Sequence, residues 1–138
     1  MDTLTGLHLV ITRPAAQADA WGQRLLELGA TVSSLPLMDI VPVQDATQVR
    51  AIKNCMLDFD LYRKAIFVSQ NAVEYGFEWI ETYWPQMPMG VQFFAVGETT
   101  AKLLAAEGVS VTDLAQTQQG AMTSETLLQS PALQQVEL

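Results

Sequence analysis

The stretch "FFAVGETTAKLL" (residues 93–104) decides how this sequence folds. An apolar run typical of a buried strand ends at Gly97, and a helical pattern of apolar residues begins two residues later. The same handover from strand to helix occurs in "AIFVSQNAVE" (65–74) and, more loosely, in "LVITRPAAQA" (9–18). Strands that alternate with helices at this spacing predict βαβ units and a parallel sheet, so the fold class is α/β.

The remaining elements follow from the same periodicities. Short apolar runs predict strands at 7–12, 30–37, 61–69, 91–97 and 109–115. Apolar residues spaced by three and four predict helices at 15–28, 47–57, 71–84, 99–107 and 123–129. Thr47 is the expected N-cap of the second helix, because threonine is favoured at that position.

Two prolines suggest a division of the chain into lobes. Pro36 and Pro42 interrupt an extended stretch and exclude a central strand throughout it. We expect residues 1–37 to give a strand–helix–strand piece of a first lobe, 38–48 to link, and 49–138 to form a second, incomplete α/β lobe. A strand–helix–strand piece cannot bury both of its faces, so it needs partner strands from further sequence or from another molecule.

Composition limits the function classes. Net charge is −8, from 15 acidic and 7 basic residues, and the basic residues are scattered, which argues against nucleic-acid binding. No apolar run approaches the roughly 20 residues that cross a membrane, so no membrane partner is expected. The start of the chain lacks a secretory pattern. The single cysteine, Cys55, is expected to pack on an apolar helix face, as in a reducing cytoplasm.

Most catalytic motifs are absent from the sequence. The single histidine, His8, is interpreted as a satisfied core or surface residue, and no set of histidines and cysteines has the spacing of a metal site. Neither a phosphate-binding loop of the G-x-x-x-x-G-K-[ST] type nor a dinucleotide fingerprint occurs. A receiver or flavodoxin-like domain is disfavoured as well, because "TRPAAQ" (12–17) follows the first strand and provides neither an acidic cluster nor a hydroxyl-rich phosphate loop.

What remains are the turns that join strands to helices. The carboxyl ends of parallel strands share one sheet edge, where ligands bind, and each helix N-terminus there offers free N–H groups to an anion. Two interpretations stay open: Ser69 or Asn71, Thr99 and Thr123 cap their own helices, or the turns face a ligand. Arg13 is the one cation in these turns and a candidate carboxylate partner.

These turns resemble those of a known family. The segments "LVITRPAAQADAWGQRLLELGATVSSLPLMDIVP" (9–42), "AIFVSQNAVEYGF" (65–77) and "FFAVGETTAKLLAAEGV" (93–109) occur in the order found in the uroporphyrinogen-III synthase family. The stretch "TSETLL" (123–128) fits too. Each segment is a weak signal alone, whereas their order and spacing are fairly specific. The resemblance covers most of residues 7–128.

The resemblance implies a cytoplasmic lyase of tetrapyrrole biosynthesis (haem, sirohaem and cobalamin). Such enzymes cyclise hydroxymethylbilane, a linear tetrapyrrole polycarboxylate, to uroporphyrinogen III with inversion of ring D and loss of water. They need no metal or organic cofactor, and porphobilinogen deaminase is a candidate to hand over the substrate. Their fold has two flavodoxin- or Rossmann-like lobes joined by an extended connection, and one lobe is assembled from both ends of the chain.

Roles carry over only where residues match. Ser69, Gln70 and Asn71 match the family's turn that touches substrate, and Thr100 matches a threonine that faces the cleft between the lobes. Gly97 permits close approach in the same turn as Thr100, and Arg13 lies in the N-terminal turn of the other lobe. The catalytic residue stays unknown, because the family's suspected tyrosine lies in a later half that this sequence does not contain.

Two further expectations follow from this length. Family members are about twice as long, so we expect the 138 residues to be inactive alone and their strand edges to swap or pair between copies. The alternative function is a non-catalytic α/β module, anion-binding or regulatory, that uses the same turns to bind a small anion.

Overall fold

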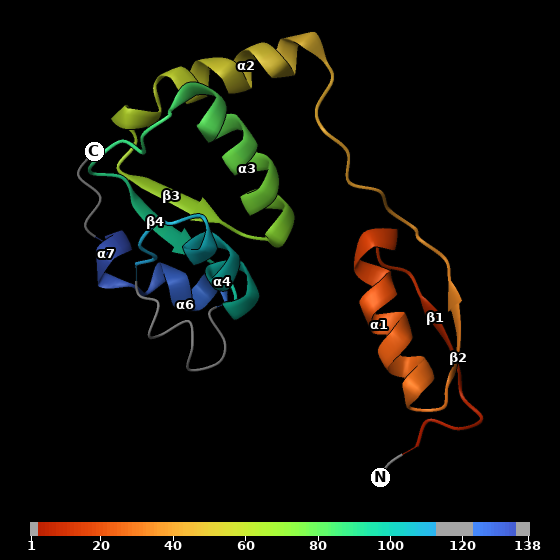
Figure 1. The fold of residues 1–138 in the computed structure, drawn as a ribbon. Coiled ribbons are helices and arrows are strands. Elements are labelled where there is room, and N and C mark those ends of the chain that lie inside the picture. The colour runs from red at the N-terminus through yellow and green to blue at the C-terminus, as the bar shows by residue number, and fades with distance from the viewer. Residues whose placement is uncertain (1–2, 113–122, 135–138) are drawn as a thin grey trace. The chain divides into compact units, whose positions relative to one another are not determined.

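The computed structural model describes residues 3–112 and 123–134 and divides into two compact units, Met1–Pro42 and Val43–Leu138. Both units consist of helices and parallel strand pairs, which confirms the α/β class (Figure 1). We call them unit 1 and unit 2 and describe each by itself.

Unit 1 is a single βαβ motif. It consists of β1 (His8–Ile11), α1 (Ala15–Glu27) and β2 (Thr31–Ser34), and the two strands pair in parallel with His8 opposite Thr31. Helix α1 covers one face of this pair, because a Cβ added at Gly22 would lie 3.7 Å from Ile11 Cδ1.

The end of α1 explains how the chain turns back into β2. The amide of Gly29 donates to the carbonyl of Leu26, and the amide of Ala30 donates to that of Leu25. These two bonds form the motif that commonly closes a helix. It requires a left-handed residue, and Gly29 has φ 88°. A Cβ at Gly29 would lie 2.8 Å from Thr5 Oγ1, so both conformation and space require glycine.

Unit 2 has a larger set of elements around a second parallel pair, in which Phe67 lies opposite Ala95. A single bridge between Phe93 and Val111 extends this pair on the β4 side. The elements, in chain order, are α2 (Ala46–Leu57), η1 (Phe59–Leu61), β3 (Lys64–Phe67), α3 (Gln70–Tyr83), β4 (Gln92–Ala95), α4 (Glu98–Ala106), α6 (Ser124–Leu128) and α7 (Pro131–Gln134).

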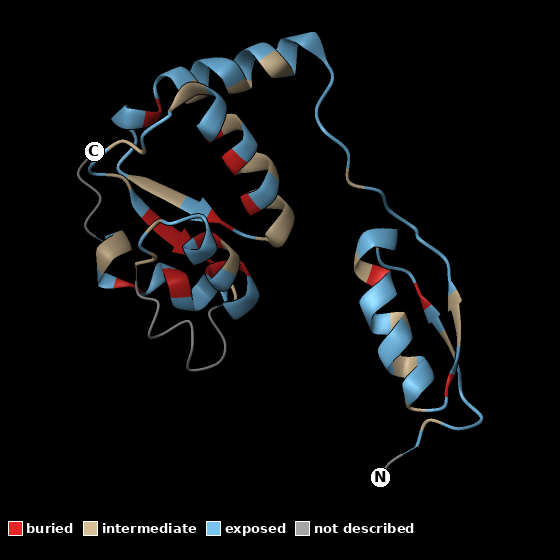
Figure 2. Cartoon of the chain, viewed as in Figure 1, coloured by how far each residue is buried: buried red, intermediate tan, exposed pale blue. Residues whose placement is uncertain are grey.

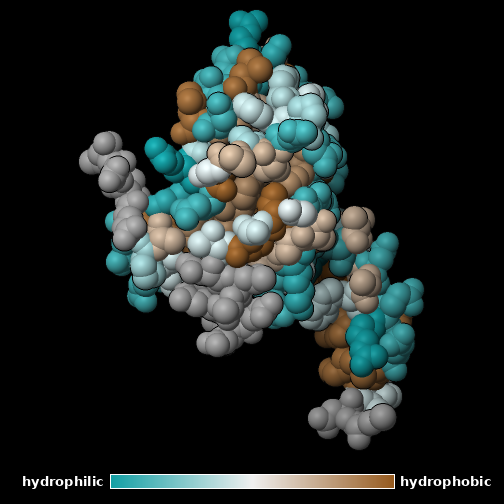
Figure 3. All heavy atoms as spheres, turned by 60° about the vertical axis from the view of Figure 1, so that its left-hand side comes forward, coloured by the Kyte–Doolittle hydropathy of each residue, from teal (hydrophilic) through white to brown (hydrophobic). Residues whose placement is uncertain are grey.

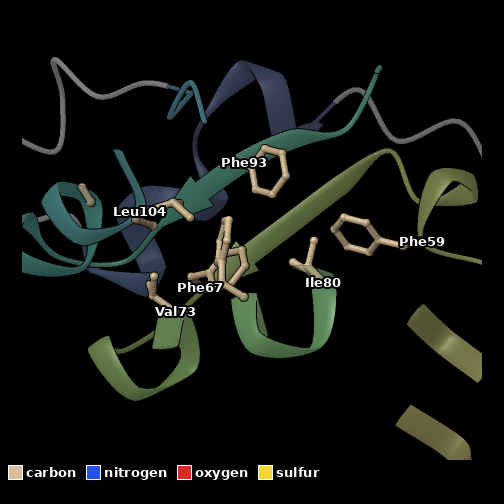
Figure 4. Close-up of a cluster of buried hydrophobic side chains, with 9 residues drawn as sticks. Phe59, Phe67, Val73, Ile80, Phe93 and Leu104 are labelled. Atoms are coloured by element: carbon tan, nitrogen blue, oxygen red, sulfur yellow. The ribbon is translucent and has the colours of Figure 1, made fainter. Parts of the chain in front are cut away.

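The core of unit 2 lies on both faces of β4, because neighbouring strand residues point to opposite faces. Phe93 joins Phe67 and Phe77 in a cluster on the side of α3 and α4, with ring centroids of Phe67 and Phe77 5.7 Å apart (Figure 4). Phe94 is fully buried on the other side, where it packs with Leu127 of α6. The two-sided burial fixes the register of β4, since a shift by one residue would exchange the two faces.

Unit 1 has a much smaller core than unit 2 (Figure 2). Among its described residues, the buried apolar side chains are Ile11, Ala18 and Ala30. Two of these are alanines, so little apolar area leaves water when this unit folds.

Several details differ from the sequence prediction. The N-cap of α2 is Asp45, not Thr47: its carboxylate accepts from the amides of Thr47 and Gln48 at 3.1 and 2.9 Å. A carboxylate binds these amides more strongly than a hydroxyl does. The predicted strand 109–115 appears as the bridge at Val111, and residues 113–115 lie outside the described residues.

Two other predictions were wrong. Cys55 is exposed rather than packed against the core. The predicted helix 123–129 is also not the last one, because a short separate helix, α7, begins at Pro131, and proline is tolerated at the first position of a helix.

Candidate functional site

The turns after β3 and β4 lie side by side at one edge of the sheet in unit 2. The two strands are parallel neighbours, and the amide of Val96 donates to the carbonyl of Phe67 over 2.8 Å where they end. The structure therefore brings the segment from Ser69 to Asn71 beside the segment from Gly97 to Thr100. This edge is where ligands bind in open α/β sheets.

The first turn begins α3 with a side-chain cap. Ser69 is extended, with φ −160° and ψ 165°, and its Oγ accepts a hydrogen bond from the amide of Ala72 at 3.1 Å. The capping interpretation of Ser69 is thus confirmed. Gln70 and Asn71 form the first helical positions and are half-buried. Their amides have no acceptor within the helix, as at any helix N-terminus.

The second turn begins α4 without a side-chain cap. Gly97 is the N-cap residue, with φ 88° and ψ 149°, a region that is essentially restricted to glycine. A Cβ added at Gly97 would meet no atom within 4 Å, so the space above the turn is open. Conformation rather than crowding therefore requires glycine here. The predicted cap at Thr99 is wrong, because the helix already begins at Glu98.

Thr100 lies on the buried side of α4 rather than on the exposed surface of this turn. It is 5% exposed, and it shares this side of the helix with Ala101 and Leu104. Its neighbour Thr99 is exposed. A ligand in the open space above Gly97 would meet mainly backbone and would reach Thr100 only through its small accessible surface.

The charges around these turns do not by themselves attract an anion. Glu98 lies in the first turn of α4 and forms an exposed ion pair with Lys102 at 2.7 Å. Exposed pairs of this kind contribute little to stability. An anionic group would instead interact with the unsatisfied amides and with the positive ends of the dipoles of α3 and α4.

Arg13, the remaining predicted site residue, belongs to unit 1. It is exposed in the turn between β1 and α1, where Pro14 precedes the helix and no side chain caps it. The amides of Gln17 and Ala18 both donate to the carbonyl of Pro14. The structure thus gives Arg13 an accessible guanidinium at a strand-to-helix turn, in the unit that does not contain the other five predicted site residues.

Other polar groups lie away from these turns. His8 is exposed and its Nε2 lies 2.7 Å from Ser33 Oγ, which confirms a surface role with a satisfied side chain. A hydrogen bond with Cys55 raises the pKa of Tyr62, and the charges of Cys55 and Asp58 act in the same direction. In the described part of the chain, no group of His, Cys, Asp and Glu side chains has the arrangement of a metal site.

Sequence reasoning missed two features of the site. Gly97 was interpreted as a place of close approach, whereas it is also the N-cap residue of α4. The burial of Thr100 could have been inferred from its spacing of four residues from Leu104, which places both on one helix face.

The fold and the site together define an α/β protein with a candidate anion site at the carboxyl edge of a parallel strand pair. The family model for uroporphyrinogen-III synthase HemD matches residues 19–137. This chain belongs to the uroporphyrinogen-III synthase family.

Curated relatives agree with this assignment. The chain is 31% identical over 134 residues to the uroporphyrinogen-III synthase of Escherichia coli (strain K12), a match that covers 94% of this chain and 50% of the relative. It is 30% identical over 130 residues to the enzyme of the same name from Salmonella typhimurium (strain LT2), with the same coverages. The chain therefore spans about half the length of these curated relatives.

Proposed function

We propose that this chain contributes to uroporphyrinogen-III synthase activity, the cyclisation of hydroxymethylbilane with inversion of ring D and loss of water. The observation that carries the proposal is the family match over residues 19–137. The paired turns at Ser69 and Gly97 support it, since they offer unsatisfied amides to the carboxylates of a linear tetrapyrrole.

We assign the binding roles as follows. The turn from Ser69 to Asn71 and the turn at Gly97 bind substrate carboxylates through backbone amides, and Thr100 contributes its hydroxyl from below. Arg13 supplies a cation from unit 1. The residues of these turns orient the flexible linear substrate so that its two ends meet. Such positioning can lower the activation free energy of a reaction by about 7–11 kcal/mol.

The proposed reaction needs no redox cofactor on chemical grounds. Overall, the hydroxymethyl C–O bond and one pyrrole C–H bond are replaced by a carbon–carbon bond, and the hydroxyl leaves with that proton as water. Inversion of ring D additionally breaks one carbon–carbon bond to that ring and forms another. The electron count does not change, so neither an oxidant nor a reductant is consumed. The catalytic acid for the leaving hydroxyl is left unassigned.

Four finer proposals accompany this function. The first is that residues 1–37 belong to a first lobe, that residues 38–48 link the two lobes, and that residues 49–138 belong to a second lobe; the absence of helix and strand from residues 35–45 supports this division.

The second is that the 138 residues alone form no uroporphyrinogen III. The third is that the protein works in the cytoplasm, where porphobilinogen deaminase hands over the substrate. The fourth is that the strand edges allow copies of the chain to swap or pair. In the described residues, no helix is both long and apolar enough to span a membrane.

The test is a coupled assay with porphobilinogen deaminase that separates isomer III from the isomer I that forms spontaneously. One sample contains this chain alone. The other contains a chimera in which this chain replaces the matched half of the Escherichia coli relative. We expect isomer III from the chimera and isomer I from the chain. A folded chimera that gives isomer I would contradict the proposal.

The second candidate is a non-catalytic anion-binding module. Uncapped amides at α4 beside an open space favour it, since anion binding needs nothing more. The two functions separate in the same chimera: a binding module would retain carboxylate binding, measured by amide chemical shifts at Gly97, without producing isomer III.

A further inference from the structure

The start of α4 is left open by the side chains around it. Helices α2, α3 and α6 each have a side-chain cap, from Asp45, Ser69 and Thr123 respectively. Helix α4 begins after Gly97, which has no side chain, and no side chain among the described residues caps it. The amides of its first turn have no acceptor within the helix. These amides are therefore open to an anion.

The first turn of α4 also contains a carboxylate of its own. Glu98 is the first residue of the helix, and the helix dipole favours a carboxylate at this end. Glu125, in the first turn of α6, shows what such a glutamate does in this chain: it accepts a hydrogen bond from its own backbone amide, which lowers its pKa. A glutamate bound in this way occupies an amide that an external anion would use. Glu98 is thus able to compete with a substrate carboxylate.

Glu98 is instead paired with Lys102. Its Oε1 lies 2.7 Å from Nζ of Lys102, one helical turn further along α4. Lys102 is 69% and Glu98 51% exposed, and hydrophilic residues occupy much of the surface in Figure 3. A solvated pair of this kind adds little to the stability of a fold. Its consequence is the direction of the carboxylate, which is drawn along the helix and away from the amides of the first turn.

We propose that Lys102 is a positioning residue, which holds the carboxylate of Glu98 aside and so keeps the first-turn amides of α4 open to an anion. That anion is the substrate carboxylate of the proposed synthase function, on which this role of Lys102 rests. Lys102 acts through Glu98 and not on the substrate itself. Without Lys102, the carboxylate of Glu98 is released to the amides and the substrate must displace it. Substrate affinity then falls, whereas the chemical step is unchanged.

The first experiment measures amide proton chemical shifts by NMR in the chain without a ligand. We expect Lys102→Met to move the amide signals of Glu98 and Thr99 downfield, because a hydrogen bond from an amide to a carboxylate is short and strong. Adding Glu98→Gln to this variant should reverse the change. Lys53→Met, which removes an exposed lysine from α2, is the matched control and should leave both signals in place. Unchanged signals in Lys102→Met would overturn the proposal.

The second experiment measures kcat and KM for hydroxymethylbilane with the chimera. We expect Lys102→Met to raise KM about threefold at unchanged kcat, the low end of the coupling between residues in contact. In a Glu98→Gln background the same substitution should leave KM unchanged, since no carboxylate is left to hold. Lys102→Arg keeps a cation for the pair and should retain the original KM. Circular dichroism checks that each variant is folded.

Two outcomes of the kinetic experiment would overturn the role of Lys102. An equal rise of KM in both backgrounds would show that the charge of Lys102 attracts the substrate directly. A lower kcat at unchanged KM would show that the pair does not act on binding. If the unmodified chimera forms no isomer III, the synthase function fails, and the chemical shifts still decide whether Lys102 holds Glu98.

Discussion

The amide of Val96 donates a hydrogen bond to the carbonyl of Phe67 over 2.8 Å, and this bond joins the ends of β3 and β4 directly before their turns. It fixes the distance between the N-termini of α3 and α4. Ser69 lies two residues after Phe67, and Gly97 directly follows Val96, so a displacement of one turn also displaces the other. The site is therefore sensitive to changes in the packing beneath it.

Gly97→Ala should reduce both stability and activity. A non-glycine residue at φ 88° and ψ 149° costs about 1–3 kcal/mol, although its Cβ would meet no atom. Gly90→Ala is the matched control, because Gly90 also has a positive φ of 93° and open space, but lies before β4. Urea unfolding should show losses in both variants, whereas isomer III production by the chimera should fall further for Gly97→Ala. Equal activities would remove Gly97 from the site.

Ser69→Ala tests whether the cap does more than hold the helix. Loss of its bond to Ala72 should lower the free energy of unfolding by about 1 kcal/mol. Asp45→Ala removes the cap of α2 and serves as a control for stability alone. We expect a lower isomer III yield only from Ser69→Ala. If both variants lose activity in proportion to stability, Ser69 is a cap and not a binding residue.

Thr100→Val should retain the fold while reducing turnover. The residue is 5% exposed, so valine fills nearly the same buried volume but lacks the hydroxyl. We expect kcat/KM of the chimera to fall at least about tenfold, equivalent to about 1.4 kcal/mol. Thr100→Ser keeps the hydroxyl and should recover most of this loss. Unchanged kinetics in the valine variant would show that the hydroxyl has no role.

Gly76→Ala and Gly22→Ala should change stability in opposite directions. Both glycines lie within helices, where alanine is favoured by about 0.5–1 kcal/mol. A Cβ at Gly76, however, would lie 3.0 Å from Phe67 Cε1, and crowding of a packed core costs about 1–3 kcal/mol. At Gly22 the nearest atom is at 3.7 Å, an ordinary contact. Amide exchange in α1 and α3 measures each effect separately. A stabilised α3 in Gly76→Ala would show that Phe67 moves freely.

The first turn of α6 should lose stability in acid. A hydrogen bond from its own backbone amide, followed by one from Thr123, holds the pKa of Glu125 below its ordinary value of 4.5. Since the folded pKa is the lower one, the stabilisation is present above about pH 4.5 and is lost as the pH falls through the folded value. An NMR titration of Glu125 should show this, and Thr123→Ala should raise the pKa. The same pKa in both proteins would exclude the hydroxyl as a cause.

Local sequence rules predicted part of the candidate site correctly. They failed where two residues compete for the same hydrogen bonds and where a contact involves residues distant in the sequence. The cap of α3 was predicted at Ser69 or Asn71, because both residue types are favoured before a helical pattern, and the structure places it at Ser69. Asp45 displaced Thr47 as the cap of α2 because both lie at the same helix start and the carboxylate is the better acceptor. Cys55 was misplaced because the helix face that reaches the core depends on what packs against it, and periodicity alone does not show this.

The sequence by itself determined the α/β alternation, the approximate helices and strands, and the family, because these depend on residue order over short distances. Only the tertiary structure decided that the turns at Ser69 and Gly97 are neighbours, since that follows from hydrogen bonds between strands 28 residues apart in register, Phe67 with Ala95. It also decided that Thr100 is buried. Whether a residue is buried or a strand is paired depends on which residues contact it, and those residues are distant in the sequence.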